Sequence, residues 1–145
     1  MAFEEIISKL PYSQPFLFVD EILEVDENGI RGTYTFDANH EFYKGHFKDN
    51  PVTPGVILTE TMAQIGLVCF GIHLMNESKN SIADVKIALT SSEVDFFKPV
   101  FPAEKVIVIS KKVYFRFNKL KCKVEMLNDK QELVCRGTIA GMIYS

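Results

Sequence analysis

A histidine, a glycine and a glutamate near the middle of this sequence offer the groups that an elimination reaction needs. His46 stands in a Gly45-His46-Phe47 stretch, within a segment that has the composition of a loop. Glu60 lies just inside a long apolar segment that opens with Pro54-Gly55. Histidine is the residue type most often used as a general base near neutral pH, so His46 suits this role. Loops carry catalytic groups more often than other elements do, which favours a functional histidine over a structural one.

Glu60 is predicted to be buried and hard to ionise. Its neighbours are almost all apolar, and Gln64, one helical turn further on, is the only other strongly polar residue on the same stripe. Burial raises the pKa of a carboxyl group. A carboxyl that stays protonated near neutral pH can act as a general acid. The alternative interpretation is a carboxylate that is solvated or paired for structural reasons.

The Pro54-Gly55 pair predicts the start of a helix, because proline suits the first helical turn. The first N–H groups of a helix have no partner within it and lie at its positive end. The N–H groups of Gly55, Val56 and Ile57 are therefore predicted to be free, and those of Gly55 and Val56 to stabilise a carbonyl oxygen that becomes an oxyanion. Gly55 also lets a ligand approach the backbone closely. A plain helix start, with no further role, is the simpler interpretation.

The elements that would position these groups follow from the periodicity of the sequence. Residues 56–75 predict one helix of about 30 Å, apolar on nearly every side and so buried all round. Its length also fits a membrane span, but the internal Glu60 and the lack of basic flanks favour a buried helix. A short helix is predicted over residues 2–10. Strand patterns cover residues 15–25, 30–36, 84–96, 105–115, 120–127 and 133–143. This order predicts an α+β fold in which a curved antiparallel sheet wraps one central helix.

Composition sets limits on the class of protein. A chain of 145 residues suits a single domain over residues 1–145. The net charge of −3 gives no general attraction to nucleic acid, and the N-terminus lacks the apolar core of a secretory signal. Three widely spaced cysteines without a CxxC motif indicate reduced, cytoplasmic thiols. His40 and His46 lack companions at metal-ligand spacing, so we expect no metal site.

The combined groups fit the elimination of water from a β-hydroxyacyl thioester. The proton at the α-carbon is acidic only when the thioester carbonyl is polarised, and hydroxide leaves readily only when it is protonated. Two other functions stay open at this point. An acyl thioesterase would use Glu60 with a water molecule and would not need the histidine. A non-catalytic acyl-binding module would need neither an acid nor a base.

The motifs PFLFVD, GHF, PGVILTETMAQ and FFKPVFP resemble the FabZ type of (3R)-hydroxyacyl-[acyl-carrier-protein] dehydratase, over about Leu10–Met142. The resemblance implies the hot-dog fold, with His46 as the base at C2, Glu60 as the acid at the 3-hydroxyl and the Gly55 N–H as carbonyl donor. It implies acyl carrier protein as the partner, a substrate held on phosphopantetheine and no cofactor of the enzyme's own. It also implies a cytoplasmic homodimer, with His46 and Glu60 meeting across the dimer interface. A plain dimer, a tetramer and a hexamer built as a trimer of dimers all stay open.

Departures from the family pattern concern the substrate rather than the chemistry. They are Tyr12-Ser13, residues 39–43, Lys48 and residues 102–104, and they leave fatty-acid synthesis and a specialised polyketide or aryl-polyene pathway both open. The sister FabA type usually has Asp at the position of Glu60, so Glu60 favours dehydration without isomerisation. A basic cluster suggests either docking of an acidic carrier protein or a solvated face that protects an edge strand. Its members are Lys111, Lys112, Arg116, Lys119, Lys121 and Lys123.

Overall fold

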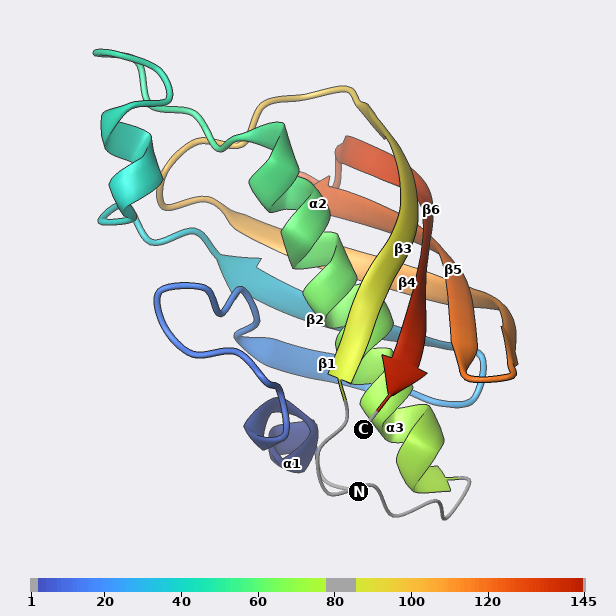
Figure 1. Ribbon diagram of the computed structural model, residues 1–145. Helices are drawn as coiled ribbons and strands as arrows, with labels where there is room; N and C mark the ends of the chain where they lie inside the picture. Colours follow the sequence, from blue (N-terminus) through green and yellow to red (C-terminus); the bar gives the residue numbers. More distant parts are fainter. Residues whose placement is uncertain (1–2, 78–85, 145) are drawn as a thin grey trace.

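A long helix lies across the inner face of a curved, six-stranded antiparallel sheet (Figure 1). The structure is a computed structural model that describes residues 3–77 and 86–144. The strands follow each other across the sheet in the order β1-β2-β4-β5-β6-β3. They are β1 (Glu21–Val25), β2 (Gly29–Thr35), β3 (Lys86–Phe96), β4 (Lys105–Arg116), β5 (Lys119–Asn128) and β6 (Leu133–Tyr144). The predicted α+β arrangement of a sheet wrapped around one helix is confirmed.

Most predicted strands agree with the structure to within one residue at their described ends, but the first does not. Residues 15–20, predicted to be extended, belong to no strand, and β1 begins only at Glu21. The side chain of Gln64 on the central helix supplies hydrogen bonds that a neighbouring strand would otherwise make to this segment. Its Oε1 accepts from Phe18 N at 2.8 Å, and its Nε2 donates to Phe16 O at 3.1 Å. The first helix, α1, is Phe3–Ser8. The predicted starts at Ala2 and Asp84 lie outside the described residues.

The central helix runs from Gly55 to Glu77. It consists of α2 (Gly55–Ala63), a π-helical stretch η2 (Gln64–Cys69) and α3 (Phe70–Glu77). Its most apolar 18-residue window is 72% buried, so it is a core helix although its length and composition would also suit a membrane span. At Gly66 the helix lies very close to the sheet, since a Cβ there would be 3.1 Å from side-chain atoms of Ser110 and Val124. The Ser110 hydroxyl on β4 donates to the Gly66 carbonyl at 2.8 Å, which satisfies a group within the π-helical stretch.

The prediction that the helix is buried all round is wrong for its first turn. Val56 is 76% exposed, whereas Leu58 is only 3% exposed. The start of α2 lies beside the loops that join the strands rather than over the sheet (Figure 1). The sheet therefore covers the helix only from about Leu58 onward, and the turn that carries the predicted oxyanion donors stays open.

The basic cluster lies on a hairpin formed by β4 and β5. These are interior strands, because β1 and β3 form the two edges of the sheet. Protection of an edge strand is thus the wrong interpretation for most of the cluster. Protection of an edge applies only to the residues of β4 that follow Lys111, because β2 no longer pairs with β4 there. Lys111 stands directly opposite Lys123, and Arg116 stands opposite Lys119 at the end of the hairpin. Phe117 at the tip is 92% exposed.

Candidate active site

His46 is held in a defined orientation by the loop that precedes the central helix. A short 3₁₀ helix, η1 (Glu41–Lys44), leads into this loop. The Nδ1 atom of His46 lies 2.9 Å from the carbonyl oxygen of Val52, and the Val52 N–H donates back to the His46 carbonyl at 2.9 Å. A carbonyl oxygen can only accept, so this bond requires the proton on Nδ1. In the neutral ring, Nε2 then carries the free lone pair that a general base needs.

The first turn of α2 presents unpaired backbone donors. Pro54 caps the helix without a side-chain hydrogen bond, and its carbonyl accepts from the N–H groups of Ile57, at 2.9 Å, and Leu58. The prediction of a free N–H is therefore wrong for Ile57. In the part of the chain that the structure describes, nothing accepts a hydrogen bond from the N–H of Gly55 or Val56. Both donors lie at the positive end of the helix dipole. This arrangement can hold a carbonyl oxygen and stabilise negative charge that develops on it.

A pocket of about 380 Å³ opens beside this turn. It is lined by Thr53, Gly55, Leu58, Phe96, Phe97, Lys98 and Pro99. The ring of Phe96 packs directly on Gly55, because a Cβ at Gly55 would lie 3.2 Å from Cζ of that ring. Glycine is therefore needed here for close approach of an aromatic side chain as well as of a ligand.

Replacing Gly55 with alanine is expected to push the Phe96 ring away from the helix start. The contact should cost about 1 kcal/mol, at the low end for overpacking because the half-exposed ring can shift. If the pocket binds substrate, kcat/KM should fall by up to about fivefold, the ratio that corresponds to about 1 kcal/mol, and the melting temperature should fall by about 2–4 °C. Phe96→Leu in the same chain makes room for the new methyl group and should recover most of the loss. Failure of the double variant to recover would mean that the ring contact is not the cause.

Glu60 lies one turn into the helix and is half-buried. Gln64 Nε2 donates to Glu60 Oε2 at 2.9 Å, and the same amide group also binds the backbone of residues 16 and 18. Burial raises the pKa of Glu60, and the hydrogen bond from Gln64 lowers it by less. Burial, and secondarily the nearby Glu60, raises the pKa of Tyr12 to about 12. The predicted rise in the Glu60 pKa is confirmed, and Gln64 fixes one oxygen of its carboxyl group.

Within a single chain, the predicted acid Glu60 and the predicted base His46 do not interact with each other through polar contacts. Within residues 3–77 and 86–144, no hydrogen bond or ion pair links His46 to Glu60. The pocket at the helix start includes Gly55 but neither of these two side chains. Sequence reasoning noted Gln64 only as a polar neighbour and missed its contact with the N-terminal segment. It also missed Phe96, whose signal was its place in the FFKPVFP motif.

The cysteines offer no alternative nucleophile. Cys69, Cys122 and Cys135 are all buried free thiols. Burial raises the pKa of Cys122 to about 11 and that of Cys135 to about 12, which keeps both in the unreactive thiol form. Among the described residues, no group of three or more His, Cys, Asp or Glu side chains is placed to hold a metal ion.

The fold and the helix-start site define a hot-dog protein with a histidine loop and a half-buried carboxyl group. Residues 10–140 match the FabA-like domain family. The chain belongs to this family, because the match spans most of its length and curated relatives align over nearly the whole chain.

Several of these relatives are bacterial enzymes named 3-hydroxyacyl-[acyl-carrier-protein] dehydratase FabZ. The protein from Wolbachia sp. subsp. Brugia malayi is 34% identical over 145 residues, which cover 97% of this chain and 95% of the relative. The one from Sinorhizobium fredii is 35% identical over 145 residues, with coverage of 98% and 89%. The one from Ehrlichia canis is 31% identical over 144 residues, with coverage of 97% and 93%.

Solved structures confirm the fold. The dehydratase heterocomplex ApeI:P from Xenorhabdus doucetiae superposes with a TM-score of 0.79 at 14% identity, covering 96% of this chain and 91% of that one. Cj0977, a sigma28-regulated virulence protein from Campylobacter jejuni, superposes with a TM-score of 0.70 at 14% identity, with coverage of 99% and 90%. At this low identity the likeness concerns the fold alone.

Proposed function

We propose that this protein, as one domain over residues 1–145, dehydrates a (3R)-hydroxyacyl thioester on acyl carrier protein to the trans-2-enoyl thioester. The single observation that carries the proposal is the open first turn of α2, whose free N–H groups stand one turn from a carboxyl group with a raised pKa. Membership of the FabA-like family and the oriented His46 support the same reaction.

Each group has one role in the proposed reaction. The N–H of Gly55, with that of Val56 beside it, holds the thioester carbonyl and makes the proton at C2 more acidic. His46 Nε2 removes that proton, and its electrons form the C2–C3 double bond. Glu60 gives its proton to the 3-hydroxyl, so the C3–O bond breaks and water leaves. No cofactor takes part, since proton transfers alone balance the reaction.

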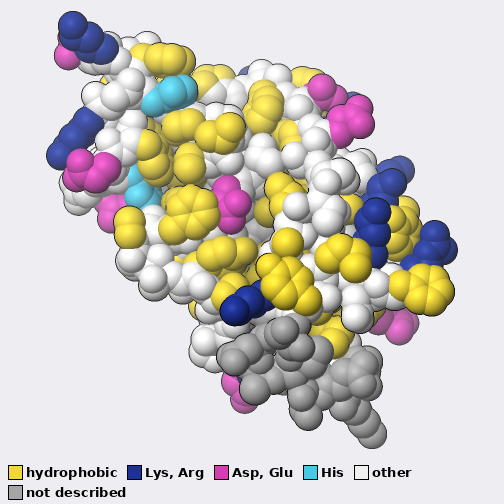
Figure 2. All heavy atoms as spheres, in the orientation of Figure 1, with side chains coloured by type: hydrophobic (Ala, Val, Ile, Leu, Met, Phe, Trp, Pro, Cys, Tyr) yellow, Lys and Arg dark blue, Asp and Glu magenta, His cyan; other side chains and the backbone are white. Residues whose placement is uncertain are grey.

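The complete site is proposed to form in a homodimer, with His46 of one subunit facing Glu60 of the other. Strand β3 lies at an edge of the sheet and is 11 residues long, so it has unpaired backbone groups available for a second copy. Hydrophobic side chains gather on the face that carries α2 and β3 (Figure 2). Exposed hydrophobic residues on these two elements include Val56, Leu89 and Phe96. Size-exclusion chromatography with light scattering distinguishes a dimer from a trimer of dimers.

The carrier protein is the proposed macromolecular partner, and the cytoplasm is the proposed location. The β4–β5 hairpin concentrates positive charge on a chain whose net charge is −3, so it offers a local docking surface for an acidic protein. Arg116 lies over the ring of Tyr114, with its Cζ 4.5 Å from the ring centroid, which fixes one cation of this surface in place.

The test is a panel of carrier-bound 3-hydroxyacyl chains, aliphatic and aryl, analysed by mass spectrometry for the loss of water. We expect a conjugated enoyl product with at least one chain, and the preferred chain identifies the substrate class. Release of free thiol without an enoyl product would instead identify a thioesterase. Tight binding without turnover on every member of the panel would identify a non-catalytic acyl-binding protein.

A further inference from the structure

The segment that links β3 to β4 forms one wall of the pocket at the start of α2. The N–H groups of Phe97 and Lys98 both donate to the carbonyl of Val134, at 2.7 and 3.2 Å. On the other side, the N–H of Thr53 donates to the carbonyl of Val100 at 2.8 Å. The segment is therefore fastened both to the start of β6 and to the residues just before the helix. Movement of this wall would displace the Phe96 ring from Gly55.

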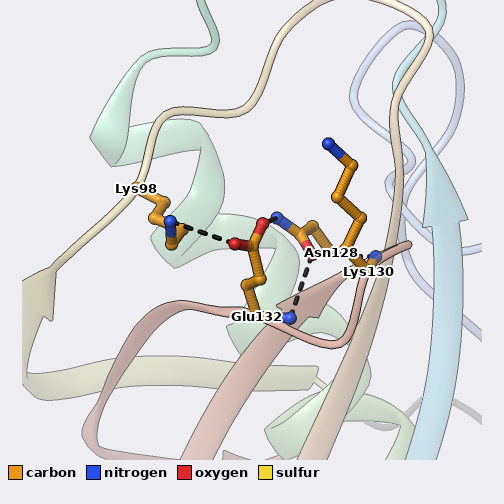
Figure 3. A network of polar contacts seen from close by, with 4 residues as sticks. All are labelled: Lys98, Asn128, Lys130 and Glu132. Atoms are coloured by element: carbon orange, nitrogen blue, oxygen red, sulfur yellow. Dashed lines mark hydrogen bonds and ion pairs between the residues drawn. The ribbon is translucent and has the colours of Figure 1, made fainter.

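A polar network ties this wall to the turn between β5 and β6 (Figure 3). Lys98 Nζ lies 3.2 Å from Glu132 Oε2. The other oxygen of Glu132 accepts from Asn128 Nδ2 at 2.9 Å. Asn128 Oδ1 in turn accepts from the backbone N–H groups of Lys130 and Glu132, each at 3.0 Å. Asn128 is buried, so the carboxylate that holds Lys98 is itself anchored to a fixed side chain.

The network orients the wall more than it stabilises the fold. Lys98 and Glu132 keep 46% and 42% of their side chains exposed, and ion pairs in such surroundings add little to stability. The hydrogen bond from Asn128, followed by the contact with Lys98, lowers the pKa of Glu132. The carboxylate is thus ionised at neutral pH, and its anchored position fixes where the Lys98 ammonium group lies.

We propose that Glu132 is a positioning residue, which acts through its ion pair with Lys98 to hold the Phe96–Pro99 wall against the start of α2. Lys98 also lines the pocket beside Gly55, so its pairing with Glu132 ties one residue of the pocket lining to the β5–β6 turn. This inference rests on the proposed function, in which that pocket receives the thioester end of the substrate.

The test compares Glu132→Gln and Lys98→Met with the wild type and with a charge-swapped chain that carries Lys98→Glu and Glu132→Lys. Both single variants should raise KM about two- to fivefold, the range expected for loss of one exposed ion pair, with little change in kcat or melting temperature. The swapped chain should recover much of the loss, because it restores an ion pair across the same gap. Glu24→Gln is the matched control: it removes the exposed Arg31–Glu24 pair, at 3.3 Å, neither member of which lines the pocket, and it should leave KM unchanged.

Hydrogen exchange provides a readout that does not depend on activity. The amides of Thr53 and Phe97 bind the two sides of the wall, and their exchange should be about two- to fivefold faster in Glu132→Gln and unchanged in Glu24→Gln. Unchanged exchange and unchanged KM in Glu132→Gln would overturn the proposal. A loss confined to Lys98→Met would also overturn it, because it would mean that Lys98 contacts the substrate directly. If the wild type lacks dehydratase activity, the hydrogen-exchange comparison still tests whether the Lys98–Glu132 ion pair holds the wall in place.

Discussion

Replacing Glu60 with glutamine is expected to lower kcat by about two to four orders of magnitude, the usual contribution of a positioned proton donor. The amide has nearly the same shape and can still accept the hydrogen bond from Gln64, which is 2.9 Å long in the native chain. It cannot give a proton to the leaving hydroxyl. Substrate binding and the melting temperature should therefore change little, and steady-state kinetics on the best substrate of the panel measures the loss in kcat.

Thr61→Val is the matched control for Glu60→Gln. Thr61 is fully buried in the same helix, and its hydroxyl donates to the Ile57 carbonyl at 2.8 Å without touching Glu60. Loss of that bond costs stability of about 1 kcal/mol but should leave kcat close to that of the wild type. An equal loss of kcat in both variants would mean that the helix, and not the carboxyl group, was disturbed.

The pH dependence follows from the raised pKa of Glu60. An acid catalyst must be protonated, so the part of the activity that depends on the Glu60 proton should fall as the pH rises through the pKa of Glu60 in the folded protein. Because burial raises this pKa above its unfolded value, the same proton contributes stability that is fully present below the unfolded pKa and is lost as the pH rises through the folded one. The Glu60→Gln variant should lack both effects.

The central helix and the environment of Glu60 could be predicted because short-range patterns determine them. A run of apolar residues after Pro54-Gly55 can only be buried in a soluble fold, and a carboxyl within that run must be hard to ionise. The same reasoning failed for Val56, which is 76% exposed. The periodicity of a sequence predicts which residues of a helix are buried on average. It does not predict at which residue the sheet that covers the helix ends.

Contacts between residues distant in the sequence could not be predicted in this way. Gln64 binds the backbone at residues 16 and 18, and Lys98 pairs with Glu132 although the strands β4 and β5 lie between them in the sequence. Each pair depends on how the sheet curves around the helix, and the residue types alone are equally compatible with solvated side chains. The pairing of His46 with Glu60 is of the same kind, because it would depend on a second copy of the chain.

Mixing two inactive variants should restore activity if the site is shared between subunits. In a heterodimer of His46→Ala and Glu60→Gln, one site has lost both groups, whereas the other takes His46 from the Glu60→Gln subunit and Glu60 from the His46→Ala subunit. That second site is intact. A one-to-one random mixture holds about half of its dimers in this form, so it should regain about one quarter of wild-type activity. A heterodimer isolated with two affinity tags should regain about half.

The geometry of the single chain is what makes this result expected. The His46 ring is fixed to Val52 on the loop, and Glu60 is fixed to Gln64 inside the helix, with no contact between the two side chains. The control is a mixture of two differently tagged His46→Ala chains, which contains no intact site in any combination and should stay inactive. If the His46→Ala and Glu60→Gln mixture also stays inactive while the isolated heterodimer is folded, each site must be built from one chain. In that case the loop that carries His46 would have to close over Glu60 of its own subunit when the substrate binds.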